Sequence, residues 1–120
     1  MVDARLRLRD AEADDALAVV DVAVEAKLRD ADAQVQAGAA RALGVIGNRG
    51  ATAALLRRAD EGGDPIVIVS VGESLAKLGA PAGRNLLEHS LGEDRYPQVQ
   101  LQAALALLDL GDDKAKTLLT

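Results

Sequence analysis

Four carboxylates near the N-terminus form the densest group of side chains that could bind a cation: Asp10, Glu12, Asp14 and Asp15. A calcium loop needs oxygen ligands at alternating positions, a glycine at its turn and a late bidentate glutamate. The next glutamate, Glu25, lies too far along the chain, in a stretch predicted to be helical. Carboxylates are favourable at the start of a helix because they oppose the helix dipole. We therefore interpret the group as a solvated helix cap and expect no bound metal.

The single histidine, His89, follows Glu88 near the end of a predicted helix. A metal site would need a second histidine or a carboxylate one helical turn away, and Asn85 at that spacing is a poor ligand. A serine nucleophile would have only His89 as its base, and the chain contains no cysteine. We interpret His89 as a partly exposed residue at a helix end, and we expect neither an enzyme nor a cofactor.

Gly44, Gly47 and Gly50 form a G-x-x-G-x-x-G pattern. This spacing matches neither the dinucleotide-binding fingerprint nor the phosphate-binding P-loop. Glycine also ends helices, because it adopts a left-handed conformation at little steric cost. We therefore interpret these glycines as helix ends and not as a phosphate site.

Charge and aromatic content argue against nucleic-acid and membrane partners. The 120-residue chain has 19 acidic and 14 basic residues, and its formal net charge of −5 disfavours contact with phosphate or anionic lipid. Tyr96 is the only aromatic residue, so bases have almost nothing to stack on. No apolar run reaches the roughly eighteen residues that a membrane-spanning helix needs.

The sequence repeats itself every 32 residues. When residues 33–47 are laid over 97–111, eight of the fifteen positions are identical. Three positions recur in all three copies, as Val35, Val67 and Val99, as Leu43, Leu75 and Leu107, and as Gly47, Gly79 and Gly111. Self-similarity at a fixed period of this length is typical of repeat proteins.

Each copy has the apolar spacing of one helix face. In the first copy the apolar residues stand at i, i+4, i+7, i+8 and i+11, which places them on one side of a helix. The predicted core faces are Val35, Ala39, Ala42, Leu43 and Ile46, then Val67, Val71, Ser74, Leu75 and Leu78, then Val99, Ala103, Ala106, Leu107 and Leu110. Shorter helices are expected between them, at 14–29, 49–60 and 81–91, with the start of another at 113–120.

Residues 66–71 offer a competing interpretation. They are rich in β-branched side chains and, taken alone, resemble a buried strand of a doubly wound α/β fold. The same register in the other two copies has strong helix formers, and tertiary context commonly overrides local propensity. We therefore expect a helix here, and a strand would overturn the repeat.

The repeated pattern, Asp-x-x-Val-x-x-x-Ala-Ala-x-Ala-Leu-Gly-x-Ile-Gly, resembles the HEAT repeat, in the short bacterial form first described in phycobilin lyases. The residues of the first copy that match it are Asp32, Val35, Ala39, Ala40, Ala42, Leu43, Gly44, Ile46 and Gly47. The resemblance implies an all-α fold, a right-handed α-solenoid of about three stacked helix pairs, with the second helix of each pair on the concave side. It divides the chain into a cap or tail at 1–13 and repeats at 14–47, 48–79 and 80–111, with a further helix beginning in 112–120.

One feature departs from that family. Its members usually carry an arginine after the conserved valine, which pairs with an aspartate of the turn and forms a ladder between repeats. The corresponding residues here are Gln36, Ile68 and Gln100, and Tyr96 stands where the third aspartate would be. We therefore expect stacking to depend on aliphatic packing and not on ion pairs.

A second resemblance is to the HEAT segments that follow the catalytic domain of some bacterial sulfatases. It rests on residues 64–79, 86–91 and 96–111. Those enzymes need a Cys or Ser followed two and four residues later by Pro and Arg, and no serine here has that sequel. The chain alone is therefore not expected to catalyse that reaction.

The side of the long helices opposite the core becomes more apolar toward the C-terminus. Isolated soluble proteins seldom leave such a row in water, because burying each Val or Leu contributes roughly 1.5–3 kcal/mol. We hypothesise that this row binds a partner through Ile66, Val69, Glu73, Leu101, Leu105 and Leu108. The alternative is that curvature of the stack or a flanking helix buries the row within the chain.

These observations predict a non-catalytic, cytoplasmic protein-interaction scaffold, as a fragment or domain of a larger protein. Its partner would be another protein or an adjacent domain of the same parent chain. Two alternatives stay open: a helical appendage of a larger, sulfatase-like hydrolase, and a chaperone subunit resembling the phycobilin lyases.

Overall fold

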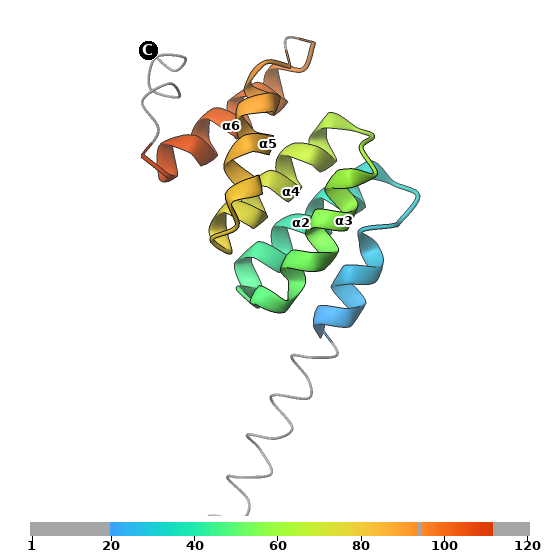
Figure 1. Cartoon of the computed structure of the whole chain (residues 1–120). Helices are drawn as coiled ribbons and strands as arrows, with labels where there is room; N and C mark the ends of the chain where they lie inside the picture. The colour runs from blue at the N-terminus through green and yellow to red at the C-terminus, as the bar shows by residue number, and fades with distance from the viewer. Residues whose placement is uncertain (1–19, 94, 112–120) are drawn as a thin grey trace, which may run out of the picture.

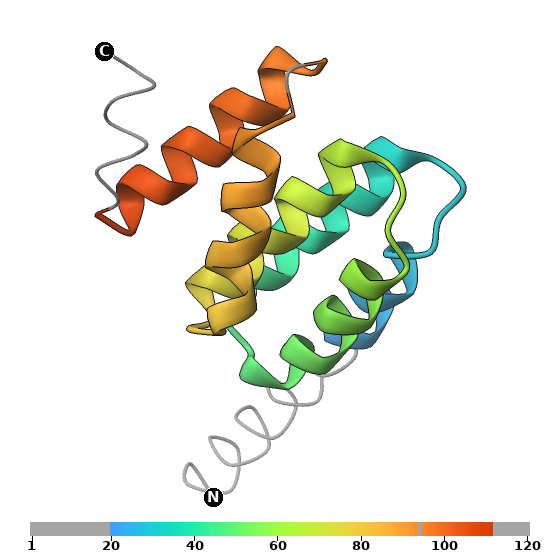
Figure 2. The same ribbon diagram turned by 45° about the horizontal axis from the view of Figure 1, so that its top comes forward.

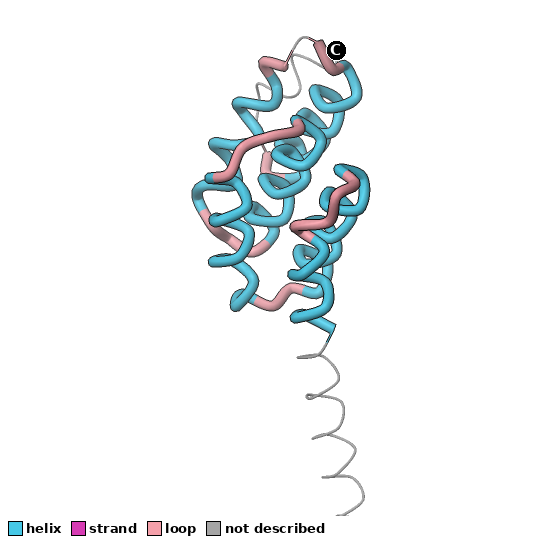
Figure 3. Tube along the Cα trace, turned by 90° about the vertical axis from the view of Figure 1, so that its right-hand side faces the viewer, coloured by secondary structure: helices cyan, strands magenta, loops and turns pink. Residues whose placement is uncertain are grey.

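The computed structural model of the chain describes residues 20–93 and 95–111. The interpretations of segment 1–13, of the carboxylates at 10–15 and of the helix start at 113–120 concern residues outside this part. Every regular element within it is helical, and Figure 3 shows no strand there. The expected all-α fold is confirmed for the described residues.

The three long helices begin at residues whose chemistry favours a helix start. Asp32 caps α2 (Ala33–Ile46) because its carboxylate accepts a hydrogen bond from the Gln34 amide at 2.8 Å. Asp64 caps α4 (Pro65–Lys77) in the same way, with a bond of 3.0 Å to the Ile66 amide. In α6 (Pro97–Asp109) the residue at the cap position is Tyr96, whose side chain makes no capping bond.

The same helices end at glycines in the left-handed conformation. Gly47, Gly79 and Gly111 have φ values of 77°, 80° and 80°. A residue with a Cβ is strained at such an angle, which explains why glycine ends each of these helices.

Shorter helices form a second layer of the stack. They are the helical residues 20–27, a short 3-10 turn (Arg49–Ala51) leading into α3 (Thr52–Asp60), and α5 (Pro81–Leu91). Figures 1 and 2 show α3 beside residues 20–27, while α2 and α6 lie on opposite sides of α4. The molecule is therefore built from two layers of helices, with α2, α4 and α6 in one of them.

Helix α4 is the centre of the stack, since it contacts α2, α3, α5 and α6. Its buried residues surround the helix on every side and are Val67, Val69, Ser70, Val71, Gly72, Ser74 and Leu75. Burial all round explains why residues 66–71 are so apolar: they form a helix in the middle of the protein, and the strand interpretation is wrong.

The predicted core faces are largely confirmed, with two exceptions. Leu43, Leu75 and Leu107 are fully buried, as are Val67, Val71 and Ala103 at other predicted positions. The exceptions are Val35 and Leu110, which are 41% and 39% exposed. Val35 lies in the first turn of α2 and Leu110 is the C-cap residue of α6, so both stand at ends of their helices.

Two contacts fix α4 against its neighbours at very short range. A Cβ at Gly44 of α2 would stand 2.6 Å from Oγ of Ser74 in α4, and that hydroxyl donates a hydrogen bond to the carbonyl of Ala40. On another side, a Cβ at Gly72 would stand 2.9 Å from Cβ of Leu86 in α5. The small residues therefore set the spacing of the helices that carry the surface described next.

Candidate functional site

Two leucines on α6 form the most exposed part of the predicted partner-binding row. Leu101 and Leu105 lie one turn apart, and each is 50% exposed. Gln98 and Asp109, both exposed, continue the same side of the helix at its two ends. We call these four residues the α6 stripe: an apolar centre with polar ends.

The expectation that Val69 is exposed is wrong. Its side chain is completely buried, in a core cluster with Val99 and Ala103 of α6 and Leu87 of α5. A helical wheel places Val69 opposite the predicted core face, but α5 and α6 cover that side of α4 as well. For this residue the alternative of burial within the chain is correct, and Val69 is removed from the candidate surface.

Ile66 and Leu108 have an intermediate position. Both are partly buried and pack against the core clusters of the chain itself. They therefore border the α6 stripe and do not project from it.

Positions 32 residues apart explain why Leu101 of α6 is exposed. Ala37 in α2 and Val69 in α4 are 2% and 0% exposed, whereas Leu101 at the equivalent position of α6 is 50% exposed. Ala37 shares a core cluster with Val67 of α4, and Val69 shares one with Val99 of α6. In each case the next long helix supplies the cover, and in the described chain α6 has no such helix beyond it.

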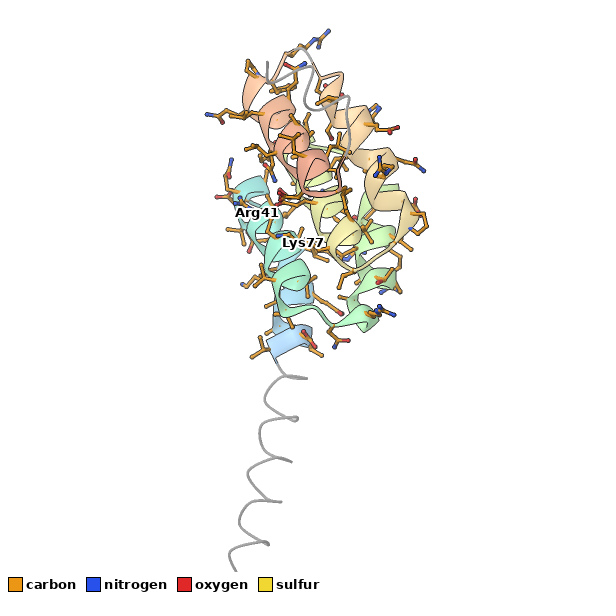
Figure 4. The ribbon with its side chains drawn as sticks, turned by 90° about the vertical axis from the view of Figure 1, so that its left-hand side faces the viewer. Arg41 and Lys77 are labelled. Atoms are coloured by element: carbon orange, nitrogen blue, oxygen red, sulfur yellow. The ribbon has the colours of Figure 1, made fainter. Side chains whose placement is uncertain are left out.

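The side chain of Glu73 in α4 is held by polar contacts with α6 and with its own helix. Its carboxylate accepts a hydrogen bond of 3.0 Å from Nε2 of Gln102 and lies 3.7 Å from Nζ of Lys77. The same Gln102 amide donates to Oγ of Ser70 at 3.2 Å. Figure 4 shows Lys77 of α4 and Arg41 of α2 on one side of the molecule, so exposed basic residues of these two helices share that side.

A pocket of about 550 Å³ opens where the N-terminal ends of α2, α4 and α6 come together. Its lining residues are Gln34, Asp64, Ile66, Arg95, Tyr96, Pro97, Gln98 and Val99. Gln98 belongs to both the pocket and the α6 stripe, so the two surfaces are continuous. The sequence did not lead us to predict Arg95 and Tyr96 as residues of this surface. For Tyr96 a signal was present, because an aromatic residue replaces the third turn aspartate.

Glutamines replace the ion-pair ladder with hydrogen bonds to the backbone. Nε2 of Gln36 donates to the carbonyl of Asp30, and Nε2 of Gln100 donates to that of Leu91 at 3.0 Å. Arg58, only 7% exposed, donates to Oε1 of Gln36 at 2.8 Å. Polar links between a long helix and the preceding turn therefore accompany the aliphatic packing that we expected.

The other sequence candidates have local structural roles. His89 lies in the last turn of α5 with an exposed side chain, and its Nε2 is 3.6 Å from Oε1 of Glu93. The interpretation of the three glycines as helix ends holds for Gly47 alone. It is wrong for Gly44, which lies inside α2 and packs against α4, and for Gly50, which lies inside the 3-10 turn and donates its amide to Asn48.

Two further findings concern the described residues alone. They contain no group of three or more His, Cys, Asp or Glu residues that could hold a metal ion. None of their helices is long and apolar enough to cross a membrane.

Comparison with known families agrees with this architecture. The family model for HEAT repeats matches residues 20–108. No curated protein matches the chain. Because the family match covers well over half of the sequence, this chain belongs to the HEAT-repeat family.

Proposed function

We propose that the chain is a non-catalytic protein-interaction scaffold whose partner binds over the α6 stripe. The observation that carries this proposal is the half-exposure of two leucines one turn apart on α6, Leu101 and Leu105. Membership of the HEAT-repeat family supports it, because these repeats generally serve as protein-interaction scaffolds.

Energetics also favour a covered state of the stripe. Complete burial of an exposed leucine side chain contributes roughly 1.5–3 kcal/mol. Because Leu101 and Leu105 are only half buried in the single chain, a partner that covers them would gain a substantial part of this free energy. The stripe has the arrangement of many interfaces, with an apolar centre and a polar rim at Gln98 and Asp109. Ile66, Leu108 and Glu73 would form the border of the contact.

We also infer the finer architecture around this surface. The repeat unit is taken to be 32 residues long, with units at 14–47, 48–79 and 80–111, and the stack is taken to be right-handed. In this arrangement α2, α4 and α6 line the concave side.

A photo-crosslinking amino acid at position 105 tests the proposal in the native cell. The matched control carries the same amino acid at position 56, because Leu56 is also an exposed leucine, at 37%, but belongs to α3 in the other layer. We expect a discrete protein adduct from position 105 and none of that mass from position 56. Identical adduct patterns from both positions, or no adduct from position 105, would overturn the proposal.

A further inference from the structure

We propose that the α6 stripe is covered by α2 of a second copy of this chain, so that copies stack head to tail. This inference rests on the proposed function, and it names the partner of the surface. The occupant is a long helix of the same kind as those already stacked in the molecule.

The first argument is that the two ends of the stack carry the two halves of one contact. Within the chain, Val67 packs in a cluster with Ala37, and Val99 packs in a cluster with Val69. In each cluster the valine comes thirty residues after the other residue, on the next long helix. Leu101 is the equivalent of Ala37 and Val69 on α6. The described chain has no further long helix that could place a valine beside it.

The valine that is left partly exposed at this position of the repeat is on α2. Val35 is 41% exposed, whereas its equivalents Val67 and Val99 are 0% and 4% exposed. Figures 1 and 2 show α2 and α6 on opposite sides of α4, so the helices that carry Val35 and Leu101 are the outermost long helices of the described stack. Placing α2 of one copy beside α6 of another would bring Val35 to Leu101 and cover both residues.

The second argument is shape. Between α4 and α6, the side chain of Glu73 meets that of Gln102. The equivalent positions at the proposed junction are Leu105 on α6 and Gly38 on α2. Gly38 is exposed, and no atom lies within 4 Å of the point where its Cβ would stand. Where the internal contact has a polar pair, the junction would therefore have a large apolar side chain opposite a vacant position.

The third argument is charge. Beyond the apolar contacts, α2 presents the exposed Arg41 and α6 presents the exposed Asp109. Opposite charges on α2 and α6 favour a junction between these two helices over contact between two α6 stripes, which would bring Asp109 residues together. Each copy would use two different surfaces, so the association is heterologous and leaves a contact surface open at both ends.

The mass of the purified full chain as a function of concentration tests the proposal, by sedimentation velocity or light scattering. We expect the mass to rise beyond two copies between the micromolar and millimolar range. A mass that stays at one copy throughout this range, or stops at two copies, would overturn head-to-tail stacking.

Two variants make the test directional. Leu101→Asp removes the α6 surface and Val35→Asp removes the α2 surface, so each variant alone should remain a single copy. An equimolar mixture retains one intact junction and should form a species of two copies only. Leu56→Asp, a change of an exposed leucine outside both surfaces, should associate like the unmodified chain.

Milder changes at the same positions, Leu101→Gln and Val35→Thr, keep the test valid if the aspartate variants unfold, and circular dichroism identifies that case. A mixture of folded single variants that forms no species of two copies would count against the proposal. If the chain stays a single copy while position 105 still crosslinks to a different protein, the second copy is excluded and the interaction surface stands. If the chain stays a single copy and position 105 gives no crosslink, the proposed interaction surface on α6 is wrong as well.

Discussion

Gly83 of α5 packs directly against the backbone of Ala76 in α4. A Cβ at position 83 would lie 2.8 Å from Cα of Ala76 and 2.8 Å from the carbonyl oxygen of Gly72. Both are backbone atoms of a helix, so neither can rotate away as the end of a side chain could. The missing side chain at position 83 therefore determines how closely α5 approaches the central helix.

Replacing Gly83 with alanine is expected to lower the free energy of unfolding by about 1–3 kcal/mol, because the helices must separate to admit one methyl group. The matched control is Gly38→Ala, at an exposed position of α2 with no atom within 4 Å. It should raise the free energy of unfolding by about 0.5–1 kcal/mol, because alanine favours the helix interior. Urea titrations in dilute solution measure both, and a stabilising Gly83→Ala would contradict the close approach.

The elements of this fold could be predicted because their signals are local. Asp32 and Asp64 are the N-cap residues of α2 and α4. Helix α5 has the predicted bounds, Pro81 and Leu91, and the apolar spacing identifies the long helices. Such signals depend on residues within one or two helical turns of each other.

The surface was harder to predict, because exposure depends on how many neighbours a helix has. Val69 and Leu101 occupy equivalent positions and have similar side chains, but one is buried and the other is half exposed. The difference comes from α6, which covers Val69 from far along the sequence. The same reasoning applies to Val35, which has the pattern of a core residue but lies in the first turn of α2 and is 41% exposed.

The cap of the central helix gives a second prediction. Asp64→Ala removes the acceptor for the Ile66 amide and should lower the free energy of unfolding by about 1 kcal/mol. Asp60→Ala is the control, because Asp60 is an exposed aspartate at the end of α3, where a negative charge opposes the helix dipole. Thermal unfolding should show a lower Tm for the first variant and an unchanged or higher Tm for the second. Equal losses would mean that the capping bond of Asp64 adds nothing beyond the general effect of removing an aspartate.

The buried link between Arg58 and Gln36 gives a third prediction. Arg58 donates to Oε1 of Gln36 at 2.8 Å and to the carbonyl of Gly62 at 2.7 Å, so Arg58→Ala should cost about 2–3 kcal/mol of stability. Arg58→Lys should restore little, because one ammonium group cannot reproduce the two directed bonds of the guanidinium. The neighbouring Arg57→Ala, at an exposed position, should change stability by less than about 0.5 kcal/mol.

A double-mutant cycle separates the link from the general effect of losing a buried side chain. Arg58→Ala and Gln36→Ala together should cost less than the sum of the two single changes, by about 0.5–1.5 kcal/mol. Strict additivity of the unfolding free energies would mean that this hydrogen bond contributes nothing to the stack.

The equivalent residues Val69 and Leu101 give the last prediction. Val69→Ala should cost about 2–3 kcal/mol, because it opens a cavity between α4, α5 and α6. Leu101→Ala removes more atoms but from a half-exposed site, so in dilute solution it should cost less than about 1 kcal/mol. The order should reverse for association, where Leu101→Ala weakens complex formation and a folded Val69→Ala leaves it unchanged. If Leu101→Ala destabilised the single chain as much as Val69→Ala, Leu101 would belong to the core, and the α6 stripe could not be an interaction surface.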